Sequence, residues 1–165
     1  MTQTENIDVK DTINLCTTLY IFNIVCMLMQ FHLWTIAPGM VGLFCIFTYA
    51  NIKQRETKGS LFESHFRWIV RTFWIGSLYY LILATAKSIY FLINSDLSMV
   101  MDAVKEGETN KLYFLELAYE KNADLALHSY FFVLGSFTLW WAWRALRGVY
   151  FIRKGAELPK VTSWL

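Results

Sequence analysis

Residues 63–94 place the strongest constraint on how this chain folds, because a charged and aromatic segment leads directly into a long apolar run. The first part, up to Trp74, mixes arginines with tryptophans, and 20 predominantly apolar residues follow from Ile75 to Asn94. Lys87 is the only charged residue in that run. Since about 20 apolar residues of helix cross the hydrocarbon core of a bilayer, the pattern predicts a membrane-spanning helix that starts at a basic, aromatic interface.

The composition favours a membrane protein over a soluble domain. Of the 165 residues, 56% are hydrophobic and 18% are aromatic, whereas soluble domains average about 45–50% apolar residues. The length suits a single membrane domain covering residues 1–165. Cys16, Cys26 and Cys45 all lie in apolar runs without metal-binding spacing, so they predict no metal or redox site. The acidic N-terminus lacks the positive charge of a secretory signal, so we expect no cleavage there.

The apolar runs predict an all-α, four-helix transmembrane bundle. The expected spans are residues 12–34, 38–52, 68–94 and 125–145. Pro38 and Gly39 follow the first run and predict a tight hairpin at that point. The segment 38–52 is short for a span, so it either crosses fully with local thinning of the bilayer or is re-entrant, and we favour full crossing. In the last span, Gly135 and Ser136 offer small side chains for close helix contact.

An acidic segment, residues 95–124, separates the third and fourth expected spans. Apolar residues recur at helical spacing on both sides of Gly107, which predicts two short amphipathic helices at the membrane surface. Over residues 95–126 there are seven acidic residues against three lysines, a net charge of −4.

Two other segments are basic, and they set the expected topology. Residues 51–71 and 144–165 each carry five lysines or arginines, against two acidic residues and one. The positive-inside bias therefore puts both segments in the cytoplasm, including the tail 146–165, and the acidic segment outside. With four spans the N-terminus is also cytoplasmic. A re-entrant 38–52 would instead place the N-terminus outside.

Most candidate binding residues gather at the cytoplasmic ends of the third and fourth expected spans. They are Glu63, His65, Arg67, Trp68, Arg71, Trp74, Trp143, Arg144 and Arg147. Glu63 and Arg67 have the i, i+4 spacing of a helical ion pair. In a bundle, the two groups would form one cationic, tryptophan-rich collar. Such a collar either anchors the helices among anionic lipid headgroups or docks a protein partner, and both interpretations stay open.

Lys87 and His128 are candidates near the opposite membrane surface. Lys87 lies about 10 Å along the helix from Asn94, the end of the third expected span. A charge inside the bilayer costs about 3 kcal/mol or more. Lys87 therefore either snorkels to the interface or pairs with Asp124 or His128, or it contacts a ligand, an ion or a partner.

No catalytic constellation is recognisable. His32, His65 and His128 lie on separate segments, and the chain has no paired membrane carboxylates, GxSxG motif or phosphate loop. No acidic residue lies inside an expected span, which argues against a proton-coupled carrier. We expect a non-enzymatic protein that needs no cofactor and binds no nucleic acid.

Two motifs resemble those of a known family. They read Ser64-His65-Phe66-Arg67-Trp68-x-x-Arg71-Thr72-Phe73-Trp74 and Trp143-Arg144-x-x-Arg147-Gly148. Similar motifs occur in a widespread family of small bacterial inner-membrane proteins of unknown function, which distantly resemble the membrane domain of the chloroplast inner-envelope protein-import channel. The acidic insertion 95–126 is longer here than in the family pattern.

The resemblance implies a multi-pass protein of the bacterial inner membrane. Small proteins of this kind commonly act as accessory or assembly factors of a larger envelope machine, and fimbrial assembly or protein export is the most concrete version. The alternative is a small oligomeric channel or permease with Lys87 on its path. A homo-oligomer is compatible with either function.

Overall fold

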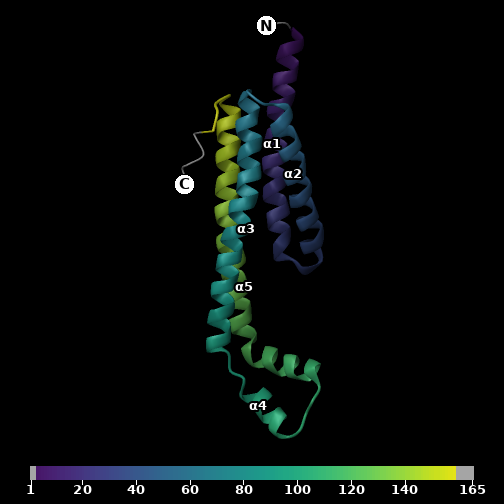
Figure 1. Ribbon diagram of the computed structural model, residues 1–165, viewed down its shortest axis with the longest axis vertical. Coiled ribbons are helices and arrows are strands. Elements are labelled where there is room, and N and C mark those ends of the chain that lie inside the picture. Colours follow the sequence, from purple (N-terminus) through teal and green to yellow (C-terminus); the bar gives the residue numbers. More distant parts are fainter. Residues whose placement is uncertain (1–2, 159–165) are drawn as a thin grey trace. The chain divides into compact units, whose positions relative to one another are not determined.

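The computed structural model describes residues 3–158, which are almost entirely helical and contain no strand (Figure 1). The helices are α1 (Gln3–Leu28), α2 (Ile36–Glu56), α3 (Leu61–Asn94), α4 (Ser98–Lys105) and α5 (Lys111–Arg153), with short 3-10 turns at Met29–Phe31 and Leu33–Thr35. The prediction of an all-α chain is confirmed. The sequence also suggests that Pro159 stops the last helix, because proline cannot continue a helix, but this residue lies outside the described residues.

Four helical segments are long and apolar enough to cross a membrane. They are Val9–Phe31, Leu33–Glu56, Leu61–Asn94 and Lys111–Arg153. Only 17–28% of the residues in the most apolar part of each segment are buried inside the chain. A soluble protein rarely exposes such continuous apolar surface, so the four segments suggest a multi-pass membrane protein. The number of spans agrees with the prediction, although the helices begin or end several residues away from the expected limits.

The first hairpin lies earlier in the sequence than predicted. The chain turns at residues 29–35, and Pro38 is already the third residue of α2. Proline is tolerated in a first helical turn because its missing N–H would have no helical acceptor there. The Thr35 hydroxyl closes the turn by donating to the carbonyl of Met29 at 2.6 Å. With 21 residues, α2 is about 32 Å long and reaches the length of a full span.

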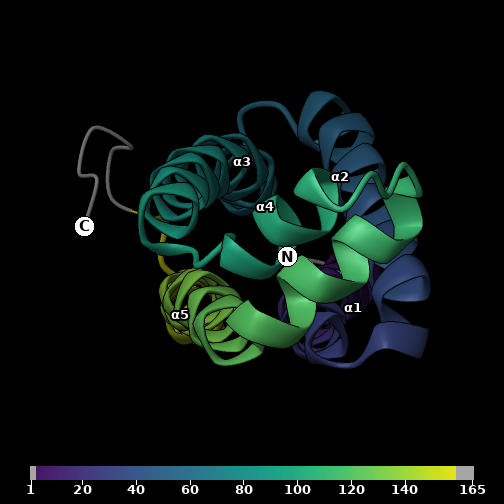
Figure 2. The same cartoon turned by 90° about the horizontal axis from the view of Figure 1, so that it is seen from below.

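The described residues divide into two compact units, where the sequence suggested a single domain. Unit 1 comprises residues 3–78 and 137–158, and unit 2 comprises Tyr79–Ser136. α3 and α5 each contribute one part to both units. Within unit 1, α1 packs along α2 (Figures 1 and 2).

Close helix packing in unit 1 depends on Gly76 and Gly148. A Cβ atom at Gly76 would lie 2.3 Å from Cζ3 of Trp141, and one at Gly148 would lie 2.3 Å from Cζ of Tyr20. Glycine therefore lets α5 approach both α3 and α1. The expected role of Gly135 in close contact is wrong, because a Cβ atom there would meet nothing within 4 Å.

Unit 2 contains the segment predicted to form two short amphipathic helices. α4 is one of them, but the second is joined to α5, and Asn122 marks the break with non-helical φ and ψ of −116° and 17°. The helix changes direction there (Figures 1 and 2). The Asn122 side chain accepts from the Asp96 N–H at 2.7 Å and donates to the Asp96 carbonyl at 2.9 Å. Hydrogen bonds from Ser98, followed by the charge of Lys121, lower the pKa of the Asp96 carboxyl.

Candidate functional site

A buried polar cluster joins three helices of unit 1. Its members are Tyr20 and Asn23 from α1, His65, Trp68 and Thr72 from α3, and Trp141 and Arg144 from α5. Each of these side chains is at least 96% buried. Because buried polar groups are costly unless they are hydrogen-bonded, their contacts determine how the three helices fit together.

His65 is a structural member of the cluster. Its Nδ1 lies 3.2 Å from the Tyr20 hydroxyl, and its Nε2 lies 3.2 Å from the carbonyl oxygen of Ala156. The ring thus links α3 to α1 and to the chain that follows α5. The sequence placed His65 among surface binding residues, but the structure buries it completely.

Trp68 and Arg144 form the centre of the cluster. The indole N–H of Trp68 donates to the Arg144 carbonyl at 3.1 Å, and Nε of Arg144 donates to the Thr72 hydroxyl at 3.0 Å. The guanidinium carbon of Arg144 lies 3.8 Å from the centre of the Trp68 ring, a cation–π contact. Arg144 is only 3% exposed and Trp68 only 1%. Their predicted place in a surface collar is therefore wrong, because the guanidinium stacks inward on the indole.

Several arginines gather around Trp68. The charges of Arg147 and Arg71 both act on Arg144, and the Arg147 guanidinium lies 5.7 Å from the Trp68 ring centre. Within residues 3–158, neither Arg71 nor Arg144 forms an ion pair. One terminal nitrogen of Arg144, Nη2, is buried and has no hydrogen-bond partner in the described part of the chain. Since buried charges are normally paired, this region has an excess of positive charge.

Asn23 and Trp141 complete the cluster. The indole N–H of Trp141 donates to the side-chain oxygen of Asn23, which ties α5 to α1. Sequence reasoning missed Tyr20 and Asn23, although two polar residues three positions apart in an apolar span share one helix face. It also missed Thr72, whose hydroxyl accepts the Arg144 hydrogen bond.

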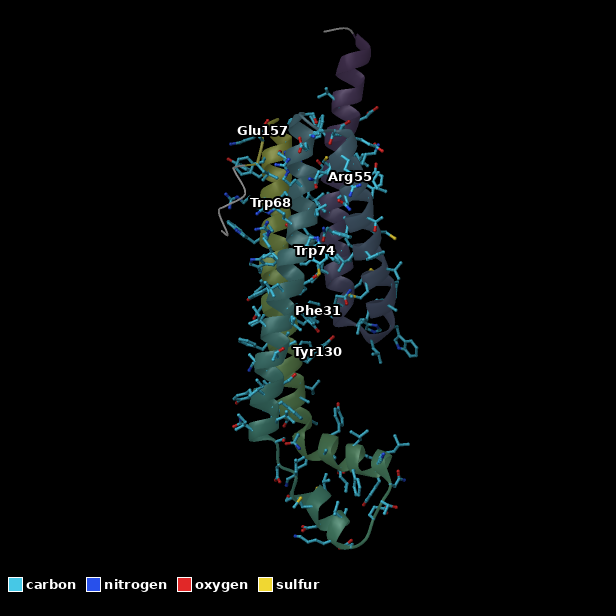
Figure 3. The ribbon with its side chains drawn as sticks, in the orientation of Figure 1. Phe31, Arg55, Trp68, Trp74, Tyr130 and Glu157 are labelled. Carbon is cyan, nitrogen blue, oxygen red and sulfur yellow. The ribbon has the colours of Figure 1, made fainter. Side chains whose placement is uncertain are left out.

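The remaining candidates of the collar lie nearer the surface of unit 1. Arg67 pairs with Glu63, as its spacing predicts, and Glu63 also accepts from the Gly59 N–H at 2.7 Å. Trp74 and Trp143 are each 63% exposed, so their rings are available to lipid or to a partner. Figure 3 shows Trp68 and Trp74 along α3.

Lys87 and His128 lie in unit 2, and Lys87 does not form an ion pair with Asp124, which was one of the partners considered for it. His128 Nδ1 instead contacts the Asp124 carbonyl oxygen at 2.7 Å. The ammonium of Lys87 lies 4.5 Å from the ring centres of both Tyr90 and Phe132. The structure shows no ion pair for Lys87 among residues 3–158. Two aromatic rings, rather than a carboxylate, therefore surround this charge.

The described residues contain no group of three or more histidine, cysteine or acidic side chains that could hold a metal ion. The cysteines are free thiols, with Cys16 and Cys26 buried and Cys45 exposed. The geometry contains two cationic sites, one around Trp68 in unit 1 and one at Lys87 in unit 2.

Comparisons of the chain with models of known families, with curated proteins and with solved structures gave no match.

Proposed function

We propose that the protein is a non-enzymatic accessory or assembly factor of the bacterial inner membrane, which serves a larger envelope machine by binding one of its components. Fimbrial assembly and protein export are the most concrete versions of this role. In this proposal both termini lie in the cytoplasm and the acidic segment 95–124 lies outside, in keeping with the positive-inside bias. The resemblance of residues 64–74 to small bacterial inner-membrane proteins supports the location.

The excess positive charge around Trp68 is the observation that carries this proposal. Arg144 is buried against the ring, and Arg71 adds a second cation without a carboxylate partner among the described residues. An acidic segment of a partner protein would be attracted to this end of unit 1, because arginine recognises carboxylates through paired hydrogen bonds. The exposed rings of Trp74 and Trp143 suit a place at the lipid headgroups, which would hold the arginines at the membrane surface.

The test is purification of the tagged full-length protein from its own host after cross-linking in intact cells, with quantitative mass spectrometry. We expect a stoichiometric membrane or secretion partner whose recovery falls about tenfold in Arg71→Gln, the loss that one charge-assisted contact predicts. Arg55→Gln is the matched control, because Arg55 is an exposed arginine at the end of α2 without an ion pair among the described residues (Figure 3).

Two results would overturn the proposal. Equal recovery of the partner with both variants would show that the arginines around Trp68 do not contribute to binding. Recovery of the protein alone, as a defined oligomer, would instead favour the small channel with Lys87 on its path. Anion flux into liposomes, lost in Lys87→Met, would then establish the channel.

A further inference from the structure

Unit 2 contains a groove between its parts of α3 and α5. The groove has a volume of about 530 Å³ and its walls are mainly apolar. Among its lining residues are Tyr80, Ala84 and Leu92 from α3 and Leu134 from α5. From Tyr80 to Leu92 the helix rises about 18 Å, close to the ~15 Å thickness of one leaflet of the hydrocarbon core. The groove is therefore long enough for the acyl chain of a lipid.

Lys87 supplies the one charge of this groove. Its ammonium rests between the rings of Tyr90 and Phe132, and no carboxylate within residues 3–158 pairs with it. Lys87 also lines a second hollow, together with His128 and three apolar residues. Lys87 thus borders two hollows whose walls are both mainly apolar.

Ser129 is another residue that lines this groove. Its hydroxyl is buried and has no hydrogen-bond partner among residues 3–158, so the hydroxyl itself is not exposed to a ligand in the groove. The groove therefore combines apolar walls with one cation, Lys87, which has no ion pair within these residues.

We propose that this groove binds an anionic phospholipid of the surrounding bilayer, with one acyl chain against the apolar walls and the phosphate at Lys87. The positive charge selects an anionic headgroup over a zwitterionic one, and from Lys87 to Tyr80 the helix rises about 10 Å, which accommodates part of one acyl chain. This inference rests on the membrane location proposed above, but not on the accessory role or on the arginines of unit 1.

Native mass spectrometry of the purified full-length protein in a neutral detergent tests the proposal. The protein is titrated with phosphatidylglycerol and, separately, with phosphatidylcholine of identical acyl chains. We expect one phosphatidylglycerol to bind at least about tenfold more tightly than phosphatidylcholine. Lys87→Met should weaken phosphatidylglycerol binding about tenfold, as expected for one charge-assisted contact. Lys111→Met is the matched control, because Lys111 is an exposed lysine of unit 2 that does not line the groove.

A second pair of variants tests the place of the acyl chain. Ala84→Phe fills the groove and should also weaken phosphatidylglycerol binding, whereas Ala86→Phe, on the same helix but outside the groove, should leave it unchanged. This pair keeps the proposal testable if Lys87→Met does not fold. Circular dichroism and gel filtration identify the variants that retain the native fold.

Three outcomes would overturn the inference. Equal affinity for the two lipids would show that the headgroup charge is not recognised. Equal effects of the paired variants would place the lipid elsewhere on the protein. Binding of glycerol phosphate as tightly as phosphatidylglycerol would identify a site for soluble phosphate esters that makes no use of the groove. None of these results depends on a partner protein, so they leave the proposed function to be judged separately.

Discussion

Replacing Gly76 by alanine tests the packing of the buried cluster directly. The new Cβ would lie 2.3 Å from Cζ3 and 2.7 Å from Cε3 of Trp141. The ring has little freedom to retreat, because Trp141 is 97% buried and its N–H is bonded to Asn23. α3 and α5 must therefore separate locally, or the hydrogen bond between α5 and α1 must break.

The magnitude follows from two opposing effects. Alanine favours a helix over glycine by about 1 kcal/mol, and overpacking a well-packed core costs about 1–3 kcal/mol. Gly135→Ala is the matched control, since Gly135 is also inside a helix and its new Cβ would meet nothing within 4 Å. Both variants gain the same helix propensity from alanine, and only Gly76→Ala is overpacked. Gly76→Ala should therefore be less stable than Gly135→Ala by about 1–3 kcal/mol.

The assay is reversible unfolding in mixed micelles, with circular dichroism recorded as the denaturing detergent is increased. We expect Gly135→Ala to be slightly more stable than the wild type and Gly76→Ala to be clearly less stable than Gly135→Ala. Equal stability of the two variants would refute the close approach of α3 and α5 at Gly76.

Four further predictions concern single contacts, the effect of pH and the topology. Asn23→Leu should destabilise the protein by about 1–3 kcal/mol in the same unfolding assay, because the buried N–H of Trp141 loses its acceptor; an unchanged stability would contradict that hydrogen bond. Asn122→Ala should increase amide hydrogen exchange at Asp96, because the Asp96 N–H loses its acceptor. Unchanged exchange would contradict the hydrogen bond between these two residues. In the wild type, the lowered pKa of Asp96 means that its ionised carboxylate, bonded to the Ser98 N–H, contributes stability above about pH 4, and this contribution should fall as the pH drops through the lowered pKa. A cysteine at Glu108 in a background without native cysteines should react with an impermeant maleimide in intact cells, and labelling only after permeabilisation would invert the proposed topology.

The helices could be predicted from the sequence because the signal for a span is local. Runs of apolar residues of the right length identify each helix regardless of its neighbours. The turns were less predictable, since Pro38 is compatible with both a break and a first helical turn. The amphipathic helix before Asn122 is expected from the sequence, but the break at Asn122 goes with hydrogen bonds from its side chain to the Asp96 backbone. Those bonds join residues that are distant in sequence.

The sequence predicts which types of residue form the candidate site, but not which of them are buried and which are exposed. Arginines and tryptophans at a helix end predict an interface with exposed rings, and the rings of Trp74 and Trp143 are exposed. The same pattern cannot distinguish Trp74 from Trp68, which lies inside the bundle because α5 brings Arg144 against it. Nor does the sequence indicate that Gly76 makes this approach of α5 feasible, since that requires knowledge of which helices are neighbours.

Arg144 and Lys87 share one physical arrangement although they belong to different units. Each cation lies against aromatic rings, at 3.8 Å from Trp68 for Arg144 and at 4.5 Å from two rings for Lys87. A ring stabilises a cation by about 0.5–2 kcal/mol without adding negative charge, whereas a carboxylate would neutralise it. The aromatic partner thus lowers the free-energy cost of placing a cation in apolar surroundings. Because the ring does not neutralise the cation, the positive charge can still attract an anionic ligand. If the rings only stabilise a buried charge, Lys87→Met should leave the binding of anionic ligands unchanged. If Lys87 recognises the ligand, the same substitution should weaken that binding.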